Sequence, residues 1–328
     1  MKRLWIAGLS LFLFLAIISV GVKIQAAEEY PTKPIIAIVP FEPGAGGDIK
    51  ARPMLEKASA ILGKPIVIVN KPGAGQTIGY REIYRAKPDG YTIGTTSATI
   101  VTAKLLGLFS YDYRDFTLLG RPHHSVPIVI ASTKRKNPFK TIEEVLSFAK
   151  SHPGEIVLAT TAVGGPYWTA AMLVQEGTGL KFNLVPQEGS GGFVVTQVAG
   201  GHVDLGILGV DESRGQIEAG NVRPLAVIGS ERFSGRYSHI PTLKEAGYDI
   251  SVRTFLGVIG PPKIPEPIVE KLVRVFETAG TDPEYVKFLL TTNNFPNYMK
   301  PDPFFKFCEE ERRMHRSIFE KAGLLKEK

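Results

Sequence analysis

The chain has 328 residues, of which 44% are hydrophobic and 22% are charged, and these are the proportions of an ordinary soluble globular protein. One core rarely grows to this length, so we expect two lobes. The formal net charge of +7 is not gathered into a cluster of Lys and Arg between aromatic residues, which argues against nucleic acid as a partner. Cys308 is the only cysteine, and the six histidines lack ligand spacing, so we expect no disulfide, metal or cofactor.

The first 27 residues resemble a secretory signal peptide. Residues 1–3 are Met-Lys-Arg, Leu4 to Val22 is almost unbroken apolar sequence, and the small residues Ala26 and Ala27 follow. An uncleaved membrane anchor is the alternative, because the apolar run is long. Removing residues 1–26 takes away three cations and lowers the net charge from +7 to +4. The expected location is outside the cytoplasm.

A short apolar strand, Ile35–Val39, is followed by the glycine-rich turn Pro43–Asp48 and a helix, Ile49–Leu62. We expect Asp48 to be the N-cap of that helix. The letters PGAG recur at Pro72–Gly75, after a second strand, Ile66–Val69. Free backbone N–H groups and the positive end of a helix dipole make such a turn suitable for an anion.

Strands and helices alternate through most of the remaining chain, which favours α/β lobes with largely parallel sheets. The further expected strands are Tyr91–Thr95, Val126–Ala131, Ile156–Ala159, Asn183–Val185, Asp204–Leu208, Leu225–Ile228 and Leu256–Ile259. The further expected helices are Ile78–Ala86, Ala98–Leu106, Ile142–Ser151, Thr169–Glu176, Phe193–Ala199, Pro267–Ala279, Pro283–Thr291 and Pro303–Ala322.

No flexible linker separates the two lobes, so the chain is expected to cross between them twice, near Arg121–Pro127 and near Val252–Gly257. The expected first lobe is discontinuous and comprises residues 28–123 and 254–328. The expected second lobe comprises residues 124–253.

Four glycine-rich turns follow expected strands, at Pro43–Asp48, Pro72–Gly79, Val163–Pro166 and Gly189–Gly192. Each one alone could be an ordinary turn that requires positive φ. Together, two in each lobe, they favour a ligand cleft with backbone donors on both sides. The sequence lacks the GxGxxG and GK[ST] patterns of nucleotide-binding loops.

Polar residues at the strand ends are candidate ligand contacts. Asp48 could accept a hydrogen bond from a ligand, and Ser97 could donate one, although both could be helix caps. Asp211 is expected at the edge of the cleft. Ser190 lacks a nucleophile elbow, and the sequence singles out no histidine as a base, so no catalytic residue is proposed.

From Tyr30 to about Gly323 the chain resembles the periplasmic solute receptors of tripartite tricarboxylate transporters, the Bug or TctC-like family. The resemblance rests on YPTKPIIAIVPFEPGAGGDIKAR, NKPGAGQTIG, AKPDGYTIGTTS, AGGHVDLGI, VRPLAVIGSERF and IPTLKEAGY, in the family's order, and on a similar C-terminal helix. It implies a two-lobed, periplasmic-binding-protein-like fold and a monomer that closes on a small organic carboxylate. It also implies two membrane partners, a large and a small permease subunit.

The resemblance places ligand contacts in both lobes. The implied residues are Phe41, Gly44, Ala45, Gly46, Gly47, Asp48, Ala74, Gly75, Gln76, Thr77, Ser97, Thr161, Gly164, Gly165, Trp168 and Asp211. In the second lobe the chain departs from the family's serine and histidine, with Gly165-Pro166-Tyr167-Trp168 instead. This change favours a less charged or partly apolar carboxylate over citrate. Trp168 could equally be buried at the start of its helix.

The expected function is therefore that of a solute-binding receptor without catalysis. A ligand-sensing subunit that acts on a membrane signalling partner, without transport, is the alternative. A secreted hydrolase would need a nucleophile and a base that the sequence does not propose. Whether Glu188 enters the cleft is left open.

Overall fold

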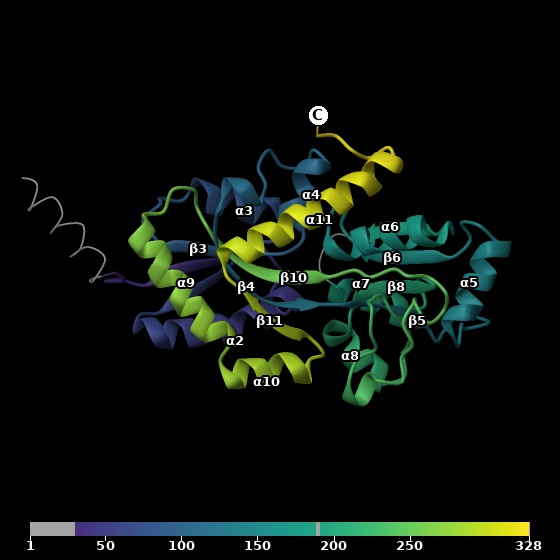
Figure 1. Ribbon diagram of the computed structural model, residues 1–328. Coiled ribbons are helices and arrows are strands. Elements are labelled where there is room, and N and C mark those ends of the chain that lie inside the picture. Colours follow the sequence, from purple (N-terminus) through teal and green to yellow (C-terminus); the bar gives the residue numbers. More distant parts are fainter. Residues whose placement is uncertain (1–29, 188–190, 328) are drawn as a thin grey trace, which may run out of the picture.

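The structure, a computed structural model, describes residues 30–187 and 191–327. The expected signal peptide and residues Glu188, Gly189 and Ser190 lie outside this part. Two mixed sheets with helices packed around them form two lobes that lie side by side (Figure 1). The fold class is therefore α/β, as the alternation of strands and helices predicts.

The first lobe is built on a six-stranded sheet in the order β11-β4-β10-β3-β1-β2. Strands β2, β1 and β3 are parallel, whereas β10, β4 and β11 join by antiparallel pairing. The strand bounds are β1 Ile35–Val39, β2 Ile66–Asn70, β3 Thr92–Thr96, β4 Thr117–Ser125, β10 Thr254–Gly260 and β11 Phe295–Met299.

Helices cover both faces of this sheet. Ile35, Ala37 and Val39 of β1 face a core shared with α2, α9 and α10, whereas Ile38 faces a second core shared with α3, α4 and α11. This alternation follows from the two-residue period of a strand. The helix bounds are α2 Gly46–Leu62, α3 Thr77–Arg85, α4 Thr99–Leu105, α9 Glu266–Gly280, α10 Pro283–Thr291 and α11 Pro301–Lys321.

The second lobe is built on a five-stranded sheet in the order β7-β6-β8-β5-β9. One continuous apolar core fills this lobe. Its strands are β5 Pro127–Ser132, β6 Val157–Thr161, β7 Asn183–Gln187, β8 Leu205–Gly209 and β9 Val222–Val227. Its helices are α5 Ile142–Ser151, α6 Pro166–Thr178, α7 Gly191–Gly200 and α8 Val210–Glu218.

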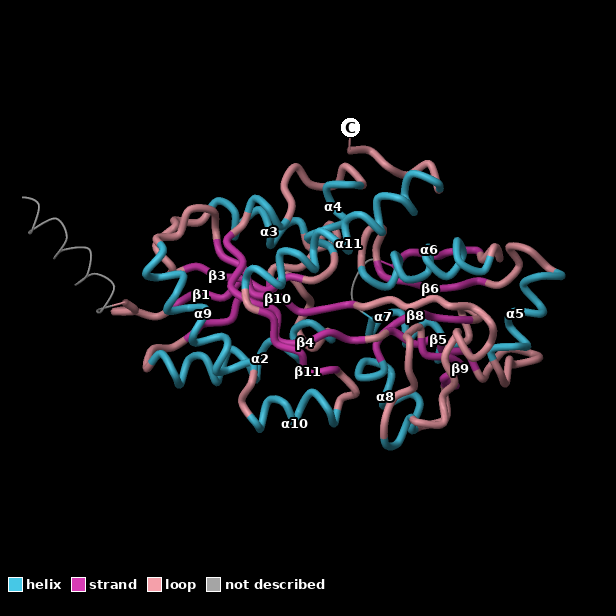
Figure 2. Tube along the Cα trace, viewed as in Figure 1, coloured by secondary structure: helices cyan, strands magenta, loops and turns pink. Residues whose placement is uncertain are grey.

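The chain leaves the first sheet at Ser125, enters the second at Pro127, and returns to the first at Thr254. The tube in Figure 2 shows β4 and β10 next to each other, with β4 leading the chain to the second lobe and β10 leading it back. The lobe bounds given above remain our proposal. Helix α11 also joins the lobes, since Ile318 and Phe319 pack in one cluster with Trp168 of α6.

Three elements differ from the sequence expectations. The segment expected to be a crossing forms most of β4, and β11 and α8 were not expected at all. Strand β4 carries Arg121 and His123, which are 1% and 0% exposed, so polar residues interrupt its buried apolar pattern. Helix α8 begins directly at the end of β8, so the sequence lacks the loop residues that normally indicate the boundary between a strand and a helix.

Candidate functional site

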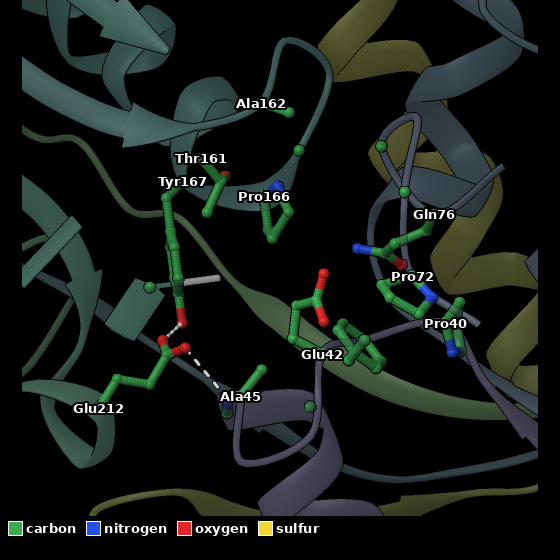
Figure 3. A pocket seen from close by; sticks show the side chains of 17 residues that line it. Pro40, Glu42, Ala45, Pro72, Gln76, Thr161, Ala162, Pro166, Tyr167 and Glu212 are labelled. Carbon is green, nitrogen blue, oxygen red and sulfur yellow. Dashed lines mark hydrogen bonds between the residues drawn. The ribbon is translucent and has the colours of Figure 1, made fainter. Parts of the chain in front are cut away.

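A cavity of about 310 Å³ lies between the lobes, at the ends of strands from both sheets (Figure 3). We call it the interlobe cavity. The described residues that line it are Pro40, Phe41, Glu42, Ala45, Gly46, Gly47, Pro72, Gly73, Gly75, Gln76, Thr161, Ala162, Gly165, Pro166, Tyr167, Gly191 and Glu212.

The first wall of the cavity is the turn between β1 and α2. Helix α2 begins at Gly46, with Ala45 as its N-cap. Its first N–H groups lack intrahelical partners, and the positive end of its dipole lies at the cavity. A Cβ atom on residue 47 would lie 2.5 Å from the Phe41 ring, so the ring can cover the turn only because residue 47 is glycine.

The second wall is the turn between β2 and α3, which has an unusual backbone. Gly73, Ala74, Gly75 and Gln76 have φ values of 110°, 46°, 59° and 75° in succession. Positive φ is unfavourable for Ala74 and Gln76, which carry side chains. Strain of this kind is commonly found at functional sites.

Gln76 points its amide nitrogen into the interlobe cavity (Figure 3). Its Oε1 atom accepts hydrogen bonds from Tyr80 Oη at 2.7 Å and from Ser97 Oγ at 2.9 Å. Because the oxygen is held by two hydroxyl donors, the amide nitrogen is left to donate to a ligand. Ser97 does not line the cavity and instead orients Gln76.

Asp48 is not the N-cap of α2, so that prediction was wrong. It is the third residue of the helix and is 1% exposed. Its Oδ2 atom accepts from Gly44 N at 2.9 Å and Arg52 Nε at 2.8 Å, and its Oδ1 atom accepts from Asn70 Nδ2 at 2.9 Å. Burial raises the pKa of Asp48, but the hydrogen bonds from Arg52, Asn70 and Gly44 outweigh burial and leave the pKa below its ordinary value. Asp48 therefore fixes the turn and does not line the cavity.

Glu212 of α8 brings a carboxylate from the second lobe to the first. Its Oε1 atom accepts from Gly46 N at 3.0 Å, and its Oε2 atom accepts from the Tyr167 hydroxyl (Figure 3). The Oε2 atom also accepts from Gly209 N at 3.4 Å. A Cβ atom on Gly46 or Gly191 would lie within 3.0 Å of this side chain. These glycines begin α2 and α7, and Gly209 is the N-cap of α8. Three helix N-termini therefore surround one carboxylate.

Burial is the largest influence on the pKa of Glu212 and raises it, and the neighbouring Asp211 raises it further. Lys50, the Tyr167 hydroxyl and the Gly46 N–H act in the opposite direction, and the net shift is upward. Asp211 itself pairs with Lys50, with Nζ 2.7 Å from Oδ2. Asp211 thus joins the lobes beside the cavity rather than lining it.

Two adjacent residues at the start of α6 have different roles. Tyr167 lines the cavity, whereas Trp168 is 5% exposed and packs with Leu105, Ile318 and Phe319. Of the two alternatives for Trp168, the structure supports burial.

Thr161, the last residue of β6, also lines the cavity. Among the described residues, its buried Oγ1 atom has no hydrogen-bond partner.

The structure brings half of the expected ligand contacts to the interlobe cavity. These are Phe41, Ala45, Gly46, Gly47, Gly75, Gln76, Thr161 and Gly165. The other expected contacts lie next to it in supporting positions: Gly44, Asp48, Ala74, Thr77, Ser97, Gly164, Trp168 and Asp211. For example, Thr77 donates to Ala74 O at 2.8 Å, and Gly164 O accepts from Thr102 of α4 at 2.8 Å.

Sequence reasoning missed several lining residues. Pro72, Gly73, Pro166 and Gly191 belong to the predicted glycine turns but were not named as contacts, and Pro40, Glu42 and Ala162 flank these turns. Glu212 is different, because it belongs to a helix that was not expected. It is the third residue of α8, and its side chain accepts from the N–H of the N-cap Gly209. Glutamate at the third position of a helix was the available signal, although Gly209 lacks the side chain of a full capping box.

The charge of the cavity lining is negative. Among the described residues, the lining contains the carboxylates Glu42 and Glu212 but no Lys, Arg or His. The same part of the chain holds no group of three or more acidic, His or Cys side chains arranged for a metal ion. Within residues 30–187 and 191–327, no helix combines the length and the apolar character needed to cross a membrane.

Comparison with known proteins identifies relatives along nearly the whole chain. Residues 50–324 match the family described as tripartite tricarboxylate transporter family receptor. Protein BugT of Bordetella pertussis is 30% identical over 319 residues, which cover 95% of each chain.

Two solved structures have the same two-lobed fold. A protein of R. palustris solved with adipate is 26% identical with a TM-score of 0.83, over 90% of this chain and 98% of that one. The periplasmic binding protein BugD is 28% identical with a TM-score of 0.78, over 90% of this chain and 99% of that one.

Proposed function

This chain belongs to the tripartite tricarboxylate transporter receptor family, and we propose that it binds a small organic carboxylate outside the cytoplasm and delivers it to a membrane permease. The family and its solved relatives are solute-binding proteins and not enzymes. The carboxylate, the extracytoplasmic location and the permease partners are the parts that we propose.

One observation carries the proposal: donors from the first lobe converge on a cavity that the second lobe closes. The Gln76 amide nitrogen points into the cavity. Gly73 and Gly75, which belong to the same strained turn with positive φ, also line it. Hydrogen-bond donors that are fixed in this way can bind an anion even where the site contains no positively charged side chain. The relative that was solved with adipate supports this choice of ligand class.

The Thr161 hydroxyl, which finds no partner within the part of the chain that the structure describes, supports a polar ligand. A buried hydroxyl without a partner costs about 1–3 kcal/mol. A ligand that reaches from Gln76 to Thr161 would satisfy donors of both lobes at once. It would therefore stabilise the closed arrangement over an open one.

The first test is thermal unfolding of residues 28–328 in the presence of mono-, di- and tricarboxylates, with uncharged and cationic analogues beside them. A ligand at a hundredfold excess over its Kd should stabilise the protein by about 2.7 kcal/mol. We expect at least one carboxylate to raise the melting temperature, and the variant Gln76→Leu to lose most of the shift. Gln216→Leu on α8, outside the cavity, should keep it. A shift with uncharged or cationic solutes only would contradict the proposal.

Delivery to a permease needs its own experiment. Uptake of the bound carboxylate is compared between cells with the two permease subunits and this chain, cells with the permease alone, and cells with the chain alone. We expect uptake only with all components. Uptake that is unchanged without the chain would contradict the role in transport.

A further inference from the structure

We propose that Glu212 occupies one of two anion positions in the interlobe cavity, so that the receptor selects a ligand with a single carboxylate over dicarboxylates and tricarboxylates. This inference rests on the proposed function and specifies its ligand class. It follows from what surrounds Glu212 and from what remains free in the cavity.

The Glu212 carboxylate occupies a position that is built for an anion. The N-termini of α2, α7 and α8 meet there, and Gly46 N–H, Gly209 N–H and the Tyr167 hydroxyl all donate to it. A ligand carboxylate would favour the same position for the same reasons. The protein's own side chain already fills it.

The carboxylate has little room to move away. A Cβ atom on Gly191 would lie 2.5 Å from Oε2, and a Cβ atom on Gly46 would lie 2.9 Å from the carboxyl carbon. Two glycine backbones thus lie against Glu212, and a side chain at either position would have to displace its carboxylate. A ligand that displaced Glu212 would exchange one carboxylate for another and would leave the displaced charge beside Asp211.

The remaining donors lie on the first-lobe side. The Gln76 amide nitrogen points into the cavity, Gly73 and Gly75 of the same turn line it, and none of them is a hydrogen-bond partner of Glu212 among the described residues. One ligand carboxylate can therefore bind at Gln76. A second carboxylate at the other end of the ligand would meet Glu212 and Glu42, with no cation among the described lining residues to balance it. Like charges at such short range oppose each other even in a polar site.

The distal part of the ligand is therefore expected to be uncharged or to donate hydrogen bonds. Proline and aromatic side chains of Pro40, Phe41, Pro72, Pro166 and Tyr167 form much of the lining around it. They suit carbon chains or an amide better than a charged group.

The experiment uses calorimetric titration with dicarboxylates and their own monoamides at four, five and six carbons, for example adipate and its monoamide. Each pair has the same length and shape and differs by one charge. We expect the wild type to bind the monoamide at least tenfold more tightly than the diacid, at the lengths that bind. In Glu212→Gln the ratio should fall below threefold. Glu218→Gln makes the same change on the same helix, outside the cavity, and should keep the wild-type ratio.

Each other outcome overturns the inference. If the wild type binds the diacid as tightly as the monoamide, Glu212 does not exclude a second carboxylate, and the carboxylate receptor stands without this selectivity. If the ratio is unchanged in Glu212→Gln, another group sets it. If none of the acids and monoamides binds to any variant, the proposed function itself fails, and the inference fails with it.

Discussion

Lys50 of α2 and Asp211 of α8 form an ion pair between the two lobes, with Nζ 2.7 Å from Oδ2 and side chains that are 7% and 5% exposed. The pair lies next to Glu212, so the second lobe contacts α2 through two consecutive acidic residues. A motion that separates the two lobes would pull these groups apart. The pair is therefore a measure of closure that is independent of the ligand.

Asp211→Asn should shift the protein toward an open form. Removal of one partner leaves the Lys50 charge buried without compensation, which costs about 3–5 kcal/mol in comparable pairs. We expect a larger radius of gyration by small-angle scattering and a weaker affinity for carboxylates. The double variant Lys50→Met with Asp211→Leu should recover most of the compactness, because neither charge remains. If the single and double variants are equally open, the pair does not control closure.

Asp48→Ala should weaken the first turn without removing a ligand contact. Gly44 N–H, Arg52 and Asn70 lose their common acceptor. The expected loss of stability is about 1–3 kcal/mol, measured by urea unfolding. Affinity should fall in parallel, through the geometry of the turn. An unchanged unfolding midpoint with lost affinity would instead mean that Asp48 contacts the ligand directly.

Glu311 of α11 should make the protein less stable as the pH rises. It is 3% exposed, and burial raises its pKa to about 7, against weaker opposing effects of Arg253 and Arg121. A carboxyl whose folded-state pKa lies above its unfolded value stabilises below the unfolded pKa and loses that contribution as pH rises through the folded pKa. Between pH 5 and 8 the free energy of unfolding of the wild type should therefore fall by about 2–3 kcal/mol because of Glu311, since each unit of pKa shift corresponds to about 1.4 kcal/mol.

The variant Glu311→Gln isolates this effect. Urea unfolding at pH 5 and pH 8 should show a smaller loss of stability toward pH 8 in the variant than in the wild type. His124 on β4 has a pKa lowered by burial to about 4, so its contribution is lost on acidification in both proteins and cancels in the comparison. Parallel pH profiles would contradict the raised pKa of Glu311.

Gly191→Ala and Gly215→Ala are a matched pair. The first places a Cβ atom 2.5 Å from Glu212 Oε2, whereas the second meets no atom within 4 Å. Gly191→Ala should displace the Glu212 carboxylate and cost about 1–3 kcal/mol, as overpacking does. Gly215→Ala, inside α8, should stabilise by about 0.5–1 kcal/mol. Equal melting temperatures for the two variants would show that Glu212 is not confined.

The glycine turns were predictable because their physical signature is local. A strand, a turn with glycine and a helix start occur within a few residues, so PGAG at residues 43–46 and 72–75 indicates two cavity walls without knowledge of the fold. Strand β4 was not predictable in this way, because Arg121 and His123 are buried for reasons that arise only from packing between β10, β11 and α11.

The local sequence also could not predict which side chains of the second lobe face the cavity. Tyr167 and Trp168 are neighbours in a helix, where successive residues point about 100° apart. Only the packing of α6 against α4 and α11 decides which one faces the cavity. Glu212 was missed for a related reason: its role depends on Gly46, 166 residues away.

The position of β10 in the first sheet fixes the order in which the two sheets can be completed during synthesis. Strands β1, β2 and β3 join β4 only through β10, which begins at Thr254, after every strand of the second sheet. A nascent chain that has reached residue 253 holds the whole second sheet, while the first sheet is still in separate pieces. One edge of β3 must therefore wait unpaired until the second lobe has been made, and a chain truncated before Thr254 cannot complete the first sheet.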